Sequence, residues 1–246
     1  MIEAFDKYVN NYDFNDENIK LKYEHSVRVM NLMVKYALLL GFSEEDIELA
    51  RLIGLLHDIG RFEQLKVYRT YVDLKSVDHA EYSVVQLFDK GEIKLFTDRE
   101  EWYPIIEFAI RYHNKRELPH CSDERVLKFA NLIRDVDKID IMYLLGVLGD
   151  LNKKINRELK VTPEVKKCIF EHEAVANEIV QNYNDRLVVQ FAFAFNIKND
   201  VVLEEYKEYF NAYYKQLEDD GSFKDMYEEI IKYIDERIDK YERNRN

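Results

Sequence analysis

Residues 55–61, Leu-Leu-His-Asp-Ile-Gly-Arg, lie near the end of an apolar helical pattern. The apolar residues of this pattern are spaced three or four positions apart, as on the buried face of a helix: Leu49, Leu52, Ile53 and Leu56. His57 follows the apolar stripe directly, and Asp58 is a carboxylate that is costly to bury without a partner. A neutral imidazole beside an ionised carboxylate is a donor pair suited to a divalent metal. Two interpretations therefore stand side by side, a metal-binding pair and a buried His–Asp hydrogen bond at a helix end.

The two residues after this pair bear on a role in ligand binding. Gly60 is predicted to end the helix, because glycine is favoured just beyond helix C-termini. The chain can then turn, so that the Arg61 guanidinium reaches a phosphate bound to the metal.

The composition favours an all-α protein. Glycine (7) and proline (3) are scarce among the 246 residues, so few residues are available for hairpins and long loops. Tyrosine (18) and phenylalanine (14) are plentiful, and long patterns of helical spacing dominate. The length allows a sizeable core, in one large domain or in one domain with an appended bundle.

The net charge of −12 argues against a nucleic acid polymer as partner, because a polyanion requires a broad basic surface. A small anionic ligand can still be held by a metal and a few basic side chains. Cys121 and Cys168 do not indicate a disulfide framework, and neither a signal peptide nor an apolar run of membrane-spanning length is found. We therefore expect a soluble, cytoplasmic protein with no membrane partner, whose oligomeric state the sequence leaves open.

Amphipathic spacing predicts a series of helices in the first 148 residues. A helix over residues 2–12 is followed by one that begins at Asn15 or Asp16 and ends near Leu40. Ser43 caps the helix that carries His57 and Asp58, and Ser76 caps a further helix. Two more helices are predicted over residues 99–113 and 122–145.

Two polar residues fall on the apolar faces of predicted helices. His25 shares its stripe with Val29, and Asp137 shares its stripe with Ile133. An aspartate at such a position needs a partner, whereas a single core histidine is ordinarily satisfied by a neighbouring hydroxyl. His79, in the first turn of its helix, is by itself typical of a solvated residue.

The pattern changes near residue 149. Residues 150–175 are charged and weakly periodic, residues 187–195 are strongly apolar, and aromatic-rich helices continue to the C-terminus. We predict a core over residues 1–148 and a C-terminal helical extension over residues 149–246 that packs on the core as one unit.

Four of the six histidines and two aspartates occur in an order that suits a metal centre. A first ion can be bound by His25, His57, Asp58 and Asp137. Asp58 can bridge to a second ion that is completed by His79 and His113. Mixed imidazole and carboxylate donors suit Mn, Fe, Co, Ni or Zn, and spacing alone does not choose among these metals.

This order resembles the HD-domain superfamily of metal-dependent phosphohydrolases, whose hallmark is His, His-Asp and Asp on consecutive helices. The corresponding residues are His25 in His-Ser-Val-Arg-Val, His57-Asp58 in His-Asp-Ile-Gly-Arg-Phe-Glu-Gln, and Asp137 in Arg-Asp-Val-Asp-Lys-Ile-Asp. The resemblance covers roughly residues 20–145 and implies an HD-domain helical core with additional helices packed on it.

His79, in Asp-His-Ala-Glu, and His113 resemble the extra ligands of dinuclear members. The resemblance implies hydrolysis of a phosphate ester on a small, nucleotide-like substrate. The chain differs from two known branches of the family, and these differences narrow the range of expected substrates. The chain lacks the paired histidines and Gly-Tyr-Pro segment of cyclic-di-nucleotide phosphodiesterases, and nothing after residue 150 resembles the synthetase-type region of guanosine tetraphosphate hydrolases.

The implied mechanism uses water activated by one or two metal ions, which lower its pKa from about 15.7 to about 7. Asp58 holds the ions, and Arg61 neutralises charge that develops on the phosphoryl oxygens. Lys115 and Lys138 are further candidates for phosphate contact, and Asp140 for orienting a ligand or a water. A surface salt bridge is the alternative role for each of these last four side chains.

Two rival hypotheses remain at this point. In one, the same pocket binds a nucleotide or a metal without catalysis, and the chain acts as a sensor through its C-terminal helices. In the other, the protein is a mononuclear phosphomonoesterase in which His79 and His113 are not ligands. The full set of six candidate ligands favours an enzyme over a sensor, because a binding module does not need all of them.

Overall fold

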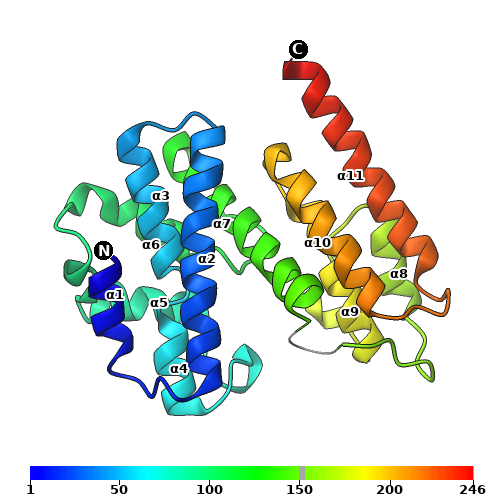
Figure 1. The fold of residues 1–246 in the computed structure, drawn as a ribbon, viewed down its shortest axis with the longest axis horizontal. Coiled ribbons are helices and arrows are strands. Elements are labelled where there is room, and N and C mark those ends of the chain that lie inside the picture. Colours follow the sequence, from blue (N-terminus) through cyan, green and yellow to red (C-terminus); the bar gives the residue numbers. More distant parts are fainter. Residues whose placement is uncertain (150–152, 246) are drawn as a thin grey trace. The chain divides into compact units, whose positions relative to one another are not determined.

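The computed structural model describes residues 1–149 and 153–245, and these residues form helices and connecting segments without a strand (Figure 1). The predicted all-α fold is confirmed. The chain forms two compact units, Met1–Val136 and Asp137–Asn246. Their boundary lies within helix α7 (Glu124–Tyr143), whereas the division predicted from the sequence, after residue 148, lies beyond the end of this helix.

The first unit is built from helices that lead up to α7 and from short 3-10 and π-helical segments between them. Its α-helices are α1 (Ile2–Val9), α2 (Glu17–Leu39), α3 (Glu44–Leu56), α4 (Gly60–Tyr68), α5 (His79–Val84) and α6 (Tyr103–Arg111). The short segments are η1 (Asp73–Lys75), η2 (Val85–Asp89), η3 (Glu92–Leu95) and η4 (Glu100–Trp102).

Helices α2 and α3 lie side by side and supply much of the core of this unit (Figure 1). Their starts agree with the predicted capping residues. The Asp16 side chain accepts a hydrogen bond from the backbone N–H of Asn18, and the Ser43 side chain accepts one from Asp46. Such caps satisfy backbone donors that have no partner within the helix.

A glycine allows the two helices to approach closely. A Cβ atom on Gly54 would lie 2.8 Å from the Cα atom of Met30, so a larger residue would force α2 and α3 apart. The close packing brings the end of α3, and with it His57, against the part of α2 that carries His25. Position 54 therefore helps to set the geometry of the candidate site.

The predicted role of Gly60 is wrong. Helix α3 already ends at Leu56, and Gly60 begins α4 instead of stopping a helix. The physical requirement for glycine is close packing, because a Cβ atom at this position would lie 2.5 Å from the backbone nitrogen of Ser83. The Ser83 hydroxyl also accepts a hydrogen bond from the Gly60 backbone N–H at 3.0 Å. Gly60 thus lets α4 pack against α5.

The helix that contains His79 begins two residues later than predicted. Asp78, not Ser76, is its N-cap, since the Asp78 carboxylate accepts hydrogen bonds from the backbone N–H groups of Ala80 and Glu81. The Ser76 hydroxyl instead accepts a hydrogen bond from Gln64. His79 is the first residue of α5 and is buried, so it is not the solvated residue that its position suggested.

The next two predicted helices are shorter than their sequence patterns. The pattern over residues 99–113 becomes the 3-10 turn η4 followed by α6, and His113 lies just beyond the end of α6. The pattern over residues 122–145 becomes α7 followed by the π-helical segment η5 (Leu144–Leu148).

The second unit contains the rest of α7, η5 and the C-terminal helices. Its further helices are α8 (Pro163–Phe170), α9 (Tyr183–Phe191), α10 (Leu203–Gln216) and α11 (Lys224–Arg245), with η6 (Asn177–Ile179), η7 (Ala192–Asn196) and η8 (Asp200–Val202) between them. Helix α11 packs against α8 and α10 (Figure 1). No helix within residues 1–149 and 153–245 has the length and apolar character needed to cross a membrane.

Candidate metal centre

Asp58 lies in the tight turn between α3 and α4 and is almost completely buried. Backbone hydrogen bonds from Ile59 to Leu56 and from Arg61 to Asp58 hold this turn. The carboxylate oxygen Oδ1 is buried without a hydrogen-bond partner among the described residues. A buried anionic oxygen in this state is costly, so the site calls for a cation.

The first group of candidate ligands, the first triad, consists of His25, His57 and Asp58. His25 projects from α2, and His57 is the C-cap residue of α3. The Nε2 atoms of the two histidines are 3.1 Å apart. Asp58 Oδ2 lies 3.5 Å from Nε2 of His25 and 3.8 Å from Nε2 of His57. Three buried donors therefore surround one point.

The second triad consists of Asp58, His79 and His113. Here too the Nε2 atoms of the two histidines are 3.1 Å apart. Asp58 Oδ1, the oxygen without a hydrogen-bond partner, lies 3.6 Å from Nε2 of His79 and 3.7 Å from Nε2 of His113. Each oxygen of Asp58 thus faces one pair of imidazoles, as the sequence-based hypothesis of a bridging Asp58 requires.

The hydrogen bonds at the opposite ring nitrogens fix that Nδ1 of these imidazoles carries a proton. Nδ1 of His57 lies 2.8 Å from the carbonyl oxygen of Gly54, and Nδ1 of His113 lies 2.7 Å from the carbonyl oxygen of Ile110. A carbonyl oxygen only accepts, so in each ring Nδ1 carries the proton and donates. In the neutral imidazole Nε2 is then left with a lone pair that is directed into the cluster.

His79 has the same arrangement with a carboxylate as acceptor. Its Nδ1 lies 2.5 Å from Oδ2 of Asp73. When both rings are in the neutral form with the proton on Nδ1, the Nε2 atoms of His79 and His113 present two lone pairs to each other at 3.1 Å. Such a contact is unfavourable unless a cation lies between the two nitrogens.

The distances suit a divalent ion in each triad. Two ligand nitrogens that are each about 2.0–2.1 Å from one ion lie about 3.0–3.4 Å apart, which agrees with the 3.1 Å found in both pairs. Buried imidazole nitrogens and one shared carboxylate are ordinary ligands of transition metals. The residues present therefore suit one ion in each triad.

Residues 23–142 match the model of the HD domain family. This part of the chain is an HD domain. The match confirms the resemblance indicated by the His, His-Asp and Asp order, and it contains all six predicted ligands. HD domains are metal-dependent phosphohydrolases that bind divalent cations, which agrees with the two triads. No curated protein and no solved structure matches the chain.

Asp73 lies behind the second triad and contacts His79. Its Oδ2 accepts the hydrogen bond from Nδ1 of His79, and its Oδ1 accepts hydrogen bonds from Arg61 at 2.9 Å and from Gln64 at 3.1 Å. A carboxylate behind a ligating histidine fixes the orientation of the ring and raises its basicity. Sequence reasoning missed Asp73, because its contact with His79 depends on the turn η1.

Charges and burial keep the ligands in the protonation states that metal binding needs. Burial alone would raise the pKa of Asp58, but the Lys22 ammonium and the nearby imidazoles outweigh it and hold that pKa well below its ordinary value. Burial lowers the pKa of His79 to about 4, even though Asp73 opposes this change. At neutral pH Asp58 is therefore ionised and His79 is neutral.

Arg61 lies in the first turn of α4, beside the second triad. Its Nε atom is 3.7 Å from Oδ1 of Asp58 and is buried without a hydrogen-bond partner among the described residues. Its Nη1 atom donates to Asp73, to the side chain of Gln64 and to the carbonyl oxygen of Tyr71. The predicted position of Arg61 near the metal pocket agrees with this geometry, although α4 and Asp73 hold it there and a helix stop does not.

The structure places the other predicted residues as follows. Lys115 forms an ion pair with Asp78, the residue that caps α5. Burial alone would raise the pKa of Asp78, but hydrogen bonds from Lys115 and its other donors lower it to about 2. Lys138 and Asp140 are buried on α7. The roles predicted for these side chains in phosphate contact and ligand orientation stay predictions.

Asp137 also lies on α7, but it is only partly buried, whereas Asp135 is completely buried. Asp137 is the first residue of the second compact unit, and its role as a ligand of the first ion stays a prediction.

Lys22 is a neighbour of the centre that sequence reasoning did not identify. Its Nζ atom lies 2.7 Å from Oδ2 of Asp58. The signal was present in the sequence, since Lys22 precedes His25 by three residues and therefore shares its face of α2.

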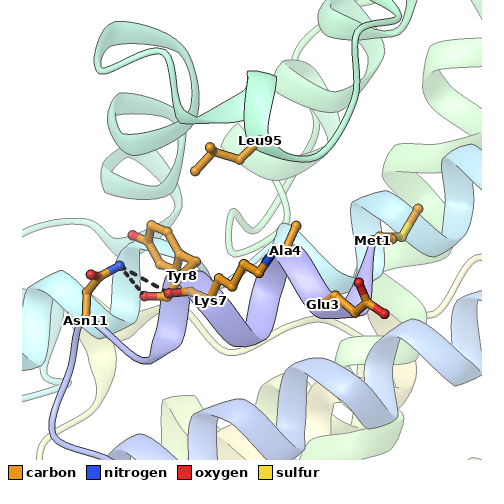
Figure 2. Close-up of a pocket in the computed structure, with 7 residues that line it drawn as sticks. All are labelled: Met1, Glu3, Ala4, Lys7, Tyr8, Asn11 and Leu95. Carbon is orange, nitrogen blue, oxygen red and sulfur yellow. Dashed lines mark hydrogen bonds between the residues drawn. The ribbon is translucent and has the colours of Figure 1, made fainter.

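A separate hollow of about 520 Å³ lies between α1 and η3. Figure 2 shows Leu95 across from the α1 side chains of Ala4 and Tyr8. The residues that line this hollow contribute no imidazole, and none of them is a predicted site residue. This hollow therefore shares no residue with either triad.

Proposed function

We propose that this HD domain hydrolyses a phosphate ester of a small, nucleotide-like molecule and uses two divalent ions, one in each triad. The observation that carries the proposal is the position of Asp58. Each of its two oxygens faces a pair of imidazole nitrogens 3.1 Å apart. Two ions that share one carboxylate in this way can clamp the attacking and leaving oxygens of a phosphoryl transfer.

The chain has distinct tasks in such a reaction. When bound, the ions supply Lewis-acid activation of a water and of the phosphoryl group. The triads hold the ions, with Asp137 as a further ligand of the first one. Asp73 keeps Nε2 of His79 directed at the second ion, and Arg61 stabilises negative charge on the phosphoryl oxygens. The donors suit Mn, Fe, Co, Ni or Zn.

The function is tested by turnover with a panel of phosphate esters. The panel contains an aryl phosphate monoester, an aryl phosphate diester and the nucleoside mono-, di- and triphosphates. We expect hydrolysis of at least one of them, loss of activity after chelation, and recovery when one of the five metals is returned. A protein that binds two ions and a nucleotide but hydrolyses no ester would be a sensor, and the proposal would be wrong.

The number of ions is tested by metal analysis of a His79→Ala variant. If each triad holds one ion, the metal content per chain should fall by about half, because His79 belongs to the second triad and not to the first. His120→Ala is the control, since His120 is exposed and should leave the metal content unchanged. One ion per chain in both the parent and His79→Ala would support a mononuclear enzyme instead.

A further inference from the structure

Lys22 is held against the first triad from one side. Its Nζ atom is 2.7 Å from Oδ2 of Asp58, the same oxygen that faces His25 and His57. The side chain is only 17% exposed. Its Nζ atom also lies 5.7 Å from the centre of the Tyr71 ring, so the ammonium makes a cation–π contact with this ring.

Arg61 occupies the corresponding place at the second triad. Its Nε atom is nearest to the other oxygen of Asp58, Oδ1. The guanidinium carbon lies 5.6 Å from the centre of the same Tyr71 ring. The Tyr71 hydroxyl donates to the carbonyl oxygen of Asn18 on α2 at 2.9 Å, which ties the ring to the helix that carries Lys22. The two oxygens of Asp58 thus each have one cationic side chain beside them, with one aromatic ring near both.

A metal ion changes the balance of charge around Lys22. An ion held by the first triad would draw on Oδ2 of Asp58, the oxygen that pairs with the Lys22 ammonium. A confined cation without a counter-ion is unfavourable, and a neighbouring divalent ion adds repulsion. An anionic oxygen of a ligand that bridges the ion and the ammonium removes both penalties.

We propose that Lys22 binds the phosphoryl group of the substrate and, with Arg61, makes the site selective for phosphate monoesters over diesters. The proposal rests on the proposed function and adds a substrate class to it. A monoester carries about −1.5 to −2 charges at pH 7, whereas a diester carries a single charge. Two cationic side chains in addition to the ions therefore favour the monoester.

The test measures binding of inorganic phosphate to metal-loaded protein by calorimetry, together with metal content. Lys22→Met keeps the length of the side chain and removes its charge. We expect the dissociation constant for phosphate to rise roughly 10- to 100-fold, as for the loss of a charge-assisted hydrogen bond, while metal content stays the same. Lys22→Arg should retain most of the affinity, and turnover of an aryl monoester should fall more than turnover of an aryl diester.

Lys20→Met is the matched control. Lys20 lies on the same helix, is more exposed and pairs with Glu17, so its loss should leave phosphate affinity unchanged. Unchanged phosphate affinity in Lys22→Met, with tighter metal binding, would show that Lys22 only balances Asp58 and would overturn the proposal. Reduced metal content in that variant would also overturn it, because Lys22 would then support the triad and not the ligand.

The two proposals fail in different ways. If the metal-loaded parent protein neither binds phosphate nor hydrolyses any ester, the proposed function fails and the role of Lys22 fails with it. If the parent binds phosphate and Lys22→Met binds it equally well, only the role of Lys22 fails.

Discussion

Asp58→Asn should lose the metal of both triads and, with it, essentially all turnover. Asparagine keeps the size of the side chain but removes the charge, and Asp58 supplies one oxygen to each triad. The loss of one uncharged transition-state donor lowers turnover by about 100- to 1,000-fold. Because Asp58→Asn should remove both ions, we expect turnover to fall roughly 1,000-fold or more and metal content to fall in parallel. The measurements are elemental analysis and initial rates at saturating substrate.

A second buried aspartate provides the control for folding. Asp46, in the first turn of α3, accepts hydrogen bonds from Arg125 and Lys128 and belongs to neither triad. Asp46→Asn should lower the melting temperature, because it breaks a partly buried ion pair, but it should keep full metal content per folded molecule. Asp58→Asn protein with two ions per chain and normal turnover would remove Asp58 from the centre.

The sequence predicted well those features of the first unit that depend on residues within one helical turn of each other. The caps at Asp16 and Ser43 need only a side chain and the backbone N–H groups that follow it. The burial of His25 followed from its place in an apolar stripe. Each of these features depends on neighbours three or four residues away, and the pattern of the chain contains that information.

Features that depend on packing between helices were not predictable in the same way. Gly60 looked like a helix end, but its role is set by the backbone of Ser83, which lies twenty-three residues further along the chain. The burial of His79 is set likewise by Asp73 and His113. A single sequence gives no measure of such distances, so the pattern around Gly60 indicates only the commonest role of glycine, a helix end.

The candidate site likewise contains residues that the sequence pattern predicts and residues that only the three-dimensional contacts identify. The candidate ligands were recognisable, because their order resembles that of the HD-domain family, and the structure brings five of the six into the two triads. Lys22 and Asp73 were not identified. Lys22 shares a face of α2 with His25, but lysine and aspartate are common on helix surfaces and in turns, so this signal alone does not single them out. Only the distances to Oδ2 of Asp58 and to Nδ1 of His79 separate these two from ordinary surface charges.

Arg61→Ala should lower turnover roughly 100-fold while both ions remain bound. The Nη1 atom of Arg61 is occupied by Asp73, Gln64 and the carbonyl oxygen of Tyr71, but Nε is buried, has no hydrogen-bond partner among the described residues and faces the cluster. If this edge of the guanidinium meets a phosphoryl oxygen, its loss removes a charged donor from the transition state. Initial rates and metal content measured on the same preparation check both parts of this expectation.

The competing explanation is that Arg61 only anchors the segment over residues 69–78. Gln64 separates the two roles, because its side chain holds the same segment through Asp73, Ser76 and Val77 and carries no charge. Gln64→Ala should therefore lower the melting temperature with a much smaller effect on turnover per folded molecule. Arg61→Lys should recover part of the rate, since lysine keeps the charge and loses the planar fork. Two results together would mean that Arg61 acts through the fold alone: equal losses of turnover in Gln64→Ala and Arg61→Ala, and no recovery in Arg61→Lys. The first would show that losing an uncharged anchor is as harmful as losing Arg61, and the second that restoring the positive charge does not help.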